Sequence, residues 1–114
     1  MARIALDKAV RDGDCEVTVV GDIDLGCADD VATLGTLSLD DPSLRSLTLD
    51  LAAVTFMDST GIGALVRIRN TALQVSKPLT LRDPSEPVTK VLKITGLDNV
   101  FAVQRTGDGI GTTR

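Results

Sequence analysis

The fold of this chain can be worked out from residues 54–63, which read Val54-Thr55-Phe56-Met57-Asp58-Ser59-Thr60-Gly61-Ile62-Gly63. An alternating apolar run leads into this stretch, and the longest helical pattern of the chain follows it. We therefore expect a strand to end and a helix to begin here, with Ser59 presenting its hydroxyl at the junction. A helix start carries unpaired backbone N–H groups and the positive end of the helix dipole, so it favours a negative charge.

The patterns on either side of the junction indicate how the sheet is covered. Residues 46–51 alternate leucines with polar residues, which predicts a strand with one buried face. A parallel strand covered by helices on both faces would be apolar throughout, so the alternation favours helices mainly on one face. Residues 59–75 have the period of an amphipathic helix. Its expected apolar side holds Ile62, Leu65, Val66, Ile68, Ala72 and Leu73.

The first part of the chain predicts a hairpin and a helix. Residues 3–7 and 15–20 alternate on either side of an Asp-Gly turn, which is typical of two antiparallel strands. A helix over residues 27–37 would place Val31, Leu34 and Leu37 on one buried stripe, while Gly35 lowers its stability.

The last part predicts a strand, a short helix and a closing strand. Residues 79–82 alternate, and a helix begins near Ser85 and ends at Gly96. We expect that helix to bury Val88, Val91, Leu92 and Ile94. Residues 100–103 would then close the sheet.

This order of elements predicts one α/β domain over residues 1–104, with a mixed, mostly parallel sheet of about five strands. Residues 105–114 are rich in glycine and have little apolar surface to bury, so we expect them to form a flexible tail.

Composition excludes several classes of function. The 114 residues carry a net charge of −4 and only two aromatic side chains, which argues against nucleic acid and membrane surfaces as partners. There is no histidine, and the two cysteines lack metal-ligand spacing, so we expect no metal, no cofactor and no catalytic residue. No apolar run is long enough for a membrane span, and free thiols fit a reducing compartment, so a cytoplasmic protein is expected.

Charge is unevenly distributed along the chain. Residues 1–58 hold twelve Asp or Glu and four Lys or Arg, whereas residues 59–114 hold four and eight. This asymmetry is compatible with an ordinary solvated surface or with an acidic rim that faces a basic partner.

Three interpretations of residues 58–63 compete. In the first, Asp58 or Ser59 caps the helix and the glycines allow close packing on the sheet. In the second, Gly61-Ile62-Gly63 begins a nucleotide-binding loop, although the third glycine is replaced by Val66 and no phosphate-binding lysine follows. In the third, Ser59 is a regulatory phosphate acceptor, because a phosphate there adds a charge of about −1.5 to −2.

A family resemblance favours the third interpretation. Leu47-Thr48-Leu49-Asp50-Leu51 together with residues 54–65 resembles the STAS domain of bacterial anti-sigma factor antagonists. Gly21-Asp22-Ile23-Asp24 is similar to the acidic element between the second strand and the first helix of that family. Order and spacing agree over residues 3–103.

The resemblance implies a partner-switching cycle. An antagonist of this family binds an anti-sigma factor that is also a serine kinase, and so frees a sigma factor. Phosphorylation of the serine after the aspartate, here Ser59, breaks the complex, and a metal-dependent serine phosphatase restores the hydroxyl. The chain would be a substrate in this cycle, not an enzyme. The expected partner-binding residues are Asp22, Asp24, Met57, Asp58, Thr60, Gly61, Ile62 and Gly63.

Two other functions remain open at this stage. In one, the chain is a STAS subunit of a transport assembly and Ser59 is only a helix cap. In the other, it is a sensor of a small molecule or nucleotide.

Overall fold

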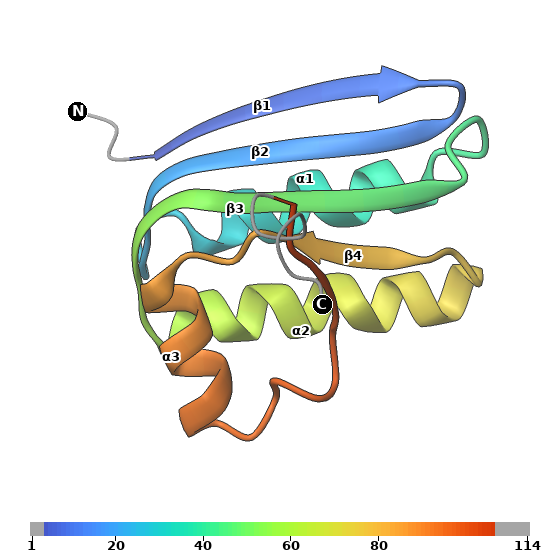
Figure 1. Ribbon diagram of the computed structural model, residues 1–114. Coiled ribbons are helices and arrows are strands. Elements are labelled where there is room, and N and C mark those ends of the chain that lie inside the picture. Colours follow the sequence, from blue (N-terminus) through green and yellow to red (C-terminus); the bar gives the residue numbers. More distant parts are fainter. Residues whose placement is uncertain (1–3, 107–114) are drawn as a thin grey trace.

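A computed structural model of the chain describes residues 4–106 (Figure 1). Five strands form one sheet, whose order in space, β1-β2-β3-β4-β5, follows the order along the chain. The elements are β1 (Ile4–Arg11), β2 (Asp14–Ile23), α1 (Ala28–Asp40), β3 (Ser46–Met57), α2 (Ser59–Val75), β4 (Leu79–Arg82), α3 (Glu86–Ile94) and β5 (Ala102–Gln104).

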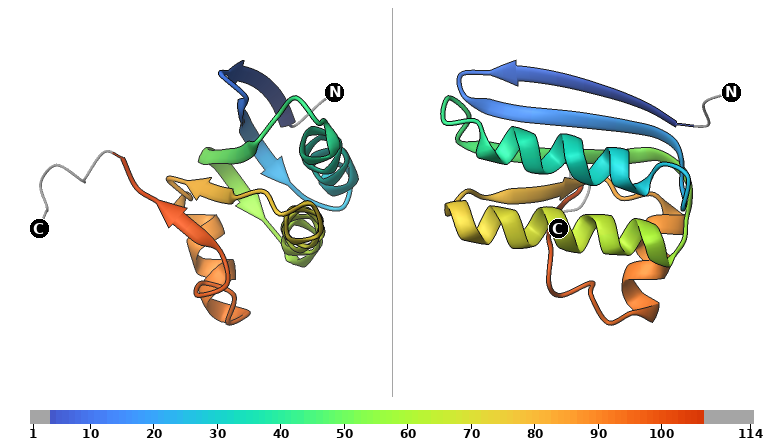
Figure 2. Two further views of the ribbon diagram at one scale, coloured as in Figure 1. Left: turned by 90° about the vertical axis from the view of Figure 1, so that its right-hand side faces the viewer. Right: turned by 180° about the vertical axis from the view of Figure 1, so that it is seen from behind.

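The sheet is mixed and mostly parallel. β1 is antiparallel to β2, and each later pair of neighbouring strands is parallel. α1 and α2 lie side by side over one face, whereas α3 is set off to one side of this pair, where it packs mainly against β3 and also contacts α2 (Figures 1 and 2). The predicted fold class and order of elements are confirmed.

The core lies between the sheet and the two long helices. Leu47, Leu49 and Leu51 of β3 are buried on the face that α1 and α2 cover, as the alternation predicts. Leu65 and Ile68 of α2 are buried in the same cluster. Burial of each of these side chains stabilises the fold by about 1.5–3 kcal/mol. β3 and α2 therefore form the centre of the core.

β3 is longer than predicted and continues directly into the junction. It runs for 12 residues and includes Val54 and Met57, whose side chains are buried. β4 pairs with β3 only as far as Asp50. Beyond that point the chain returns to β3 through a hydrogen bond from Ser85 N to Leu51 O of 3.2 Å, and α3 packs against β3.

The predicted buried stripe of α1 is wrong at Leu37, which is 63% exposed. Val31 is buried as predicted, and the rest of the buried face includes the small residues Ala32 and Gly35. A Cβ atom at Gly35 would lie 2.6 Å from Ile68 Cδ1, so this glycine lets α1 approach α2 closely. The cost of Gly35 to the helix is therefore offset by packing between the helices.

Two other apolar positions differ from the prediction for a similar reason. Ile94, at the end of α3, is 74% exposed, and Leu73 of α2 is 61% exposed. Both lie on helices whose apolar pattern is wider than the surface that covers them.

The closing strand starts at Ala102, while Phe101 just before it is buried.

The far ends of the helices and sheet are held by polar contacts. Lys77 Nζ donates to Leu39 O at 2.7 Å and to Asp41 O at 2.8 Å, so it satisfies carbonyl groups at the end of α1. Thr106 N–H and its hydroxyl both donate to the Asp83 carboxylate.

The predicted tail begins at residue 105, and its residues 107–114 lie outside the described residues.

Candidate functional site

Asp58 caps α2. Its carboxylate accepts hydrogen bonds from Thr60 N–H at 2.9 Å and from Gly61 N–H at 3.3 Å, and also from the Thr60 hydroxyl. The Thr60 hydroxyl is the largest cause that lowers the pKa of Asp58, and the two backbone N–H groups act in the same direction. Asp58 is therefore the ionised capping residue expected at a helix N-terminus.

Ser59 is the first residue of α2, and its side chain is exposed. Three hydroxyl-bearing residues lie at the junction, and two of their hydroxyls are engaged: Thr60 donates to Asp58, and Thr55 donates to Asp22 at 2.6 Å. Within residues 4–106 the Ser59 hydroxyl makes no hydrogen bond. Among these three residues, Ser59 is thus the exposed one whose hydroxyl is not held by a neighbouring carboxylate.

The end of β2 lies beside the junction because β2 and β3 are parallel neighbours. Ile23 is opposite Met57 in the register, and Asp58 N–H donates to Ile23 O at 3.4 Å. Asp22 is held by Thr55, as above, and the Asp24 carboxylate accepts from Gly26 N–H at 3.0 Å. The two predicted acidic residues therefore lie at the same corner of the molecule as Ser59.

Three of the predicted partner-binding residues are buried. Met57 is 3% exposed and Ile62 is 7% exposed, so both belong to the core and offer little surface for contact. A Cβ atom on Gly61 would overlap Met57 Cγ and lie 3.1 Å from Ile23 O. These residues hold the start of α2 against β2, and their burial leaves little of their own surface for direct contact with a partner.

Gly63 has a different environment from Gly61. It is exposed, and a Cβ atom there would meet nothing within 4 Å. It borders a shallow hollow of about 390 Å³ between the starts of α1 and α2, which Leu25 and Thr60 also line. Of the predicted residues, Thr60 and Gly63 thus lie on accessible surface next to Ser59.

Two apolar residues of this corner were missed by the sequence prediction. Leu25 is 80% exposed and Phe56 is 48% exposed. Phe56 is opposite Asp22 in the register of β2 and β3. Leu25 directly follows the acidic motif of residues 21–24, and Phe56 lies within the quoted residues 54–63, so their position at these motifs was the available signal.

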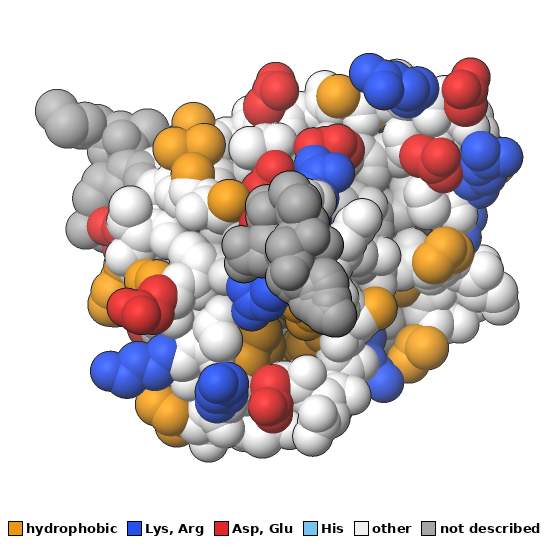
Figure 3. Space-filling model, in the orientation of Figure 1, with side chains coloured by type: hydrophobic (Ala, Val, Ile, Leu, Met, Phe, Trp, Pro, Cys, Tyr) orange, Lys and Arg blue, Asp and Glu red, His pale blue; other side chains and the backbone are white. Residues whose placement is uncertain are grey.

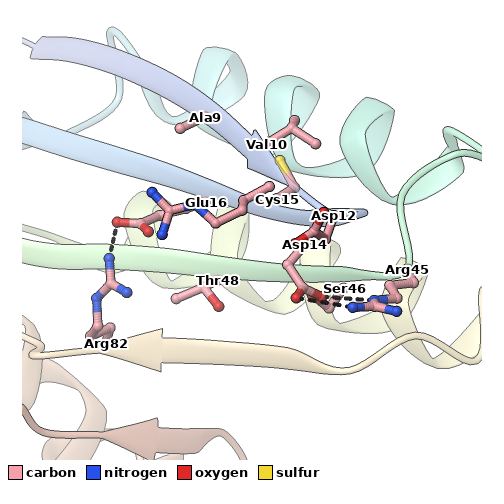
Figure 4. Close-up of a pocket in the computed structure, with 11 residues that line it drawn as sticks. Ala9, Val10, Asp12, Asp14, Cys15, Glu16, Arg45, Ser46, Thr48 and Arg82 are labelled. Atoms are coloured by element: carbon pink, nitrogen blue, oxygen red, sulfur yellow. Dashed lines mark hydrogen bonds and ion pairs between the residues drawn. The ribbon is translucent and has the colours of Figure 1, made fainter.

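A second hollow, of about 530 Å³, lies on the open face of the sheet. Arg82 from β4 pairs there with Glu16 of β2 and with Asp50 of β3 at 3.3 Å (Figure 4). Arg45 pairs with Asp14 at 3.1 Å. Acidic and basic side chains also lie next to one another along this face in Figure 3. The charged groups of this hollow are thus paired with one another across neighbouring strands. These ion pairs account for its charged residues without a ligand.

The junction lacks the features of a nucleotide or metal site. The N–H groups of Thr60 and Gly61, which a phosphate-binding loop would offer to its ligand, are taken by Asp58. Within residues 4–106 no three His, Cys, Asp or Glu side chains are grouped as metal ligands. None of the helices in that range is long and apolar enough to cross a membrane.

Comparison with known proteins gives a family match. A sequence model of the STAS domain matches residues 5–109. Among solved structures, an anti-sigma factor antagonist from Mycobacterium paratuberculosis has 27% sequence identity and a TM-score of 0.75, with 91% of this chain and 87% of that chain covered.

Two structures of another protein have the same fold. The anti-sigma factor antagonist SpoIIAA in its unphosphorylated form has 18% identity and a TM-score of 0.76, with 93% of this chain and 91% of that chain covered. The Bacillus cell fate determinant SpoIIAA in the phosphorylated form has 17% identity and a TM-score of 0.72, with 93% and 95% covered.

Proposed function

Because the chain belongs to the STAS domain family, we propose that it is an anti-sigma factor antagonist that is switched off by phosphorylation of Ser59. In its unphosphorylated form it binds an anti-sigma factor that is also a serine kinase, and this binding releases a sigma factor. A serine phosphatase returns the chain to its active form. The chain itself is the substrate of both enzymes and acts in the cytoplasm.

The observation that carries this proposal is the accessibility of the Ser59 hydroxyl. A kinase must bring the acceptor oxygen in line with the γ-phosphate of ATP. The hydroxyl therefore has to be exposed and not held by a hydrogen bond within the chain. Ser59 is exposed at the first position of α2, whereas the neighbouring Thr55 and Thr60 hydroxyls are bound to carboxylates. Ser59 also matches the position of the phosphorylated serine in the family that the sequence resembles.

The added phosphate changes the charge of the surface without a need to unfold it. Asp58 already accepts from the N–H groups of Thr60 and Gly61, so a phosphate on Ser59 would remain in solvent beside a carboxylate. Together the two groups carry a charge of about −2.5 to −3. A partner that covers this corner would have to desolvate that charge, and the complex is weakened as a result.

The surface that the partner covers contains Asp22, Asp24, Thr60 and Gly63 around Ser59. Leu25 and Phe56 supply the exposed apolar area that most protein interfaces contain at their centre. Met57, Gly61 and Ile62 contribute indirectly, because they fix the position of this corner from the core.

The test is phosphorylation by purified kinases. Each anti-sigma factor serine kinase encoded in the source genome is incubated with the chain and ATP, and the modified residue is mapped by mass spectrometry. We expect one phosphate on Ser59 and none in Ser59→Ala. Ser76→Ala is the matched control, since Ser76 is an exposed serine at the opposite end of α2 and should leave modification unchanged.

Binding to the same kinase provides the second measurement. Ser59→Ala should bind as the wild type does, whereas Ser59→Asp should bind more weakly because a carboxylate supplies part of the charge of a phosphate. Modification at another residue, or no modification by any of these kinases, contradicts the proposed function. Copurification with an ATP-binding transport subunit would favour the transport assembly instead.

A further inference from the structure

The hollow beside Ser59 has properties that point to a specific kind of contact. It lies between the start of α1 and the second turn of α2, and its lining includes Leu25, Ala28, Asp29, Thr60, Gly63 and Arg67. We propose that this hollow, the α1–α2 groove, receives an apolar side chain from a basic segment of the protein partner. This inference rests on the proposed function and names the contact that holds the unphosphorylated complex.

Gly63 gives the groove its depth. Glycine weakens a helix relative to alanine. A glycine in the second turn of α2 is therefore expected where a larger side chain would interfere with packing or with binding. Packing within the chain supplies such a reason for Gly35 and Gly61, because a Cβ atom at either would collide with a neighbour. Apart from the two adjacent residues and the nearby backbone of α2, no atom of the described chain lies within 4 Å of a Cβ atom at Gly63. The space is therefore available to another molecule.

Leu25 forms an apolar wall at the same place. Its side chain is 80% exposed, although the chain buries most of its other leucines. An exposed leucine alone is unremarkable, but one that lines a hollow floored by small residues can be covered by a single inserted side chain. Ala28 and Gly63 leave room for that side chain, and Leu25 would be removed from water on binding.

The charges around the groove select the partner. Asp29 and Asp30 lie in the first turn of α1, and Asp24 precedes it. Arg67 is the basic residue of the lining, and it pairs with Asp29 at 2.9 Å across the two helices. This ion pair offsets the charge of Asp29, and the negative charge that is left on the α1 side is that of the exposed Asp30, so a segment with Lys or Arg beside its apolar residue fits the groove best.

This arrangement is consistent with the switch at Ser59. The basic segment faces α1, whereas the Ser59 hydroxyl faces the bound nucleotide of the kinase, which is itself anionic. Thr60 lines the groove and directly follows Ser59, so a phosphate would lie at the rim of the contact. The side chain in the groove holds the partner in place while the hydroxyl is phosphorylated, and the new charge then opposes the nucleotide.

The test fills the groove without changing the fold. Gly63→Leu places a side chain in space that the chain leaves open, and Leu25→Ala removes the wall. Asn70→Leu is the matched control, because Asn70 lies two turns further along the same exposed side of α2 and does not line the groove. Circular dichroism and thermal unfolding verify that each variant is folded, and titration calorimetry measures binding to the kinase that modifies Ser59.

We expect Gly63→Leu and Leu25→Ala each to weaken binding at least about tenfold, as is typical of central interface contacts, and Asn70→Leu to change it less than about twofold. Raising the salt concentration should weaken binding of the wild type further, because the partner segment is basic. Wild-type affinity in Gly63→Leu overturns the groove contact, and binding insensitive to salt overturns the basic character of the partner.

The two proposals fail separately. If Ser59 is phosphorylated and Gly63→Leu binds normally, the groove contact is wrong and the proposed function stands. If no kinase binds or modifies the wild-type chain, both are wrong.

Discussion

Two glycines separated by one residue should respond to alanine in opposite ways. Gly61 and Gly63 both lie in the first two turns of α2, but only Gly61 faces the sheet. In Gly61→Ala the new Cβ atom would overlap Met57 Cγ and lie 3.0 Å from Ile23 Cγ2 and 3.1 Å from Ile23 O. Because one of these atoms belongs to the backbone of β2, moving a side chain alone cannot relieve the collision.

The magnitudes follow from packing and helix propensity. Overpacking of this kind costs about 1–3 kcal/mol, and the helix gains less than about 1 kcal/mol in return. Gly61→Ala should therefore lower the free energy of unfolding by about 1–2 kcal/mol, or the midpoint of thermal unfolding by about 4–8 °C. Gly63→Ala adds a Cβ atom in open space, so it should raise the free energy of unfolding by about 0.5–1 kcal/mol, or the midpoint by about 2–4 °C.

Thermal and urea unfolding followed by circular dichroism measure both changes. The double variant should lie near the sum of the two, and its urea dependence should match that of the wild type. If Gly61→Ala is as stable as the wild type, the close approach of α2 to β2 is wrong. If Gly63→Ala is less stable than the wild type, Gly63 has a structural role in the chain and the argument for an open groove fails.

Three further predictions concern the ends of the helices. Lys77→Met should lower the free energy of unfolding by about 1–2 kcal/mol in urea unfolding, since it removes two hydrogen bonds to carbonyl groups at the end of α1; an unchanged value would contradict that contact. Ser76 has a φ angle of 57°, so Ser76→Gly should raise the thermal midpoint by about 2–4 °C, and a lower midpoint would contradict the left-handed conformation. Thr60→Val should raise the pKa of Asp58, measured by NMR titration of its carboxyl group, because the Thr60 hydroxyl is the main cause that lowers it. Since the folded-state pKa is below the unfolded one, the cap stabilises the wild type above the unfolded pKa and is lost as pH falls through the folded pKa. Thr60→Val should lose the stabilisation by this cap at a higher pH than the wild type does. Identical titration curves of Asp58 in the two proteins would refute this prediction.

The sequence predicted the fold because its strongest patterns are set by local geometry. Residues 46–51 and 59–75 have clear periods, and β3 and α2 are found there. The prediction failed where burial depends on which element covers a side chain. Leu37 and Ile94 continue the apolar pattern of their helices, yet neither faces the sheet or a neighbouring helix, and both are exposed.

The candidate site was predicted in part for the same reason. Asp22 lies near the end of β2 and Asp58 directly follows β3, and their proximity follows from the parallel pairing of these two strands. The roles of Gly61 and Gly63 could not be separated by sequence, because they differ only in what stands opposite each Cα atom. Leu25 was missed because a single leucine in an acidic loop has no period that would mark it.

The structure also changes how the interpretations of the junction relate to one another. Capping and phosphate acceptance were treated as alternatives for one short motif, but the two tasks fall on different residues. Asp58 satisfies the N–H groups of Thr60 and Gly61, which leaves the Ser59 hydroxyl without a task in the fold. A residue that contributes little to folding can be modified at little cost to stability. In our proposal the cap is therefore what makes the switch possible, because it holds the helix start whether or not Ser59 carries a phosphate.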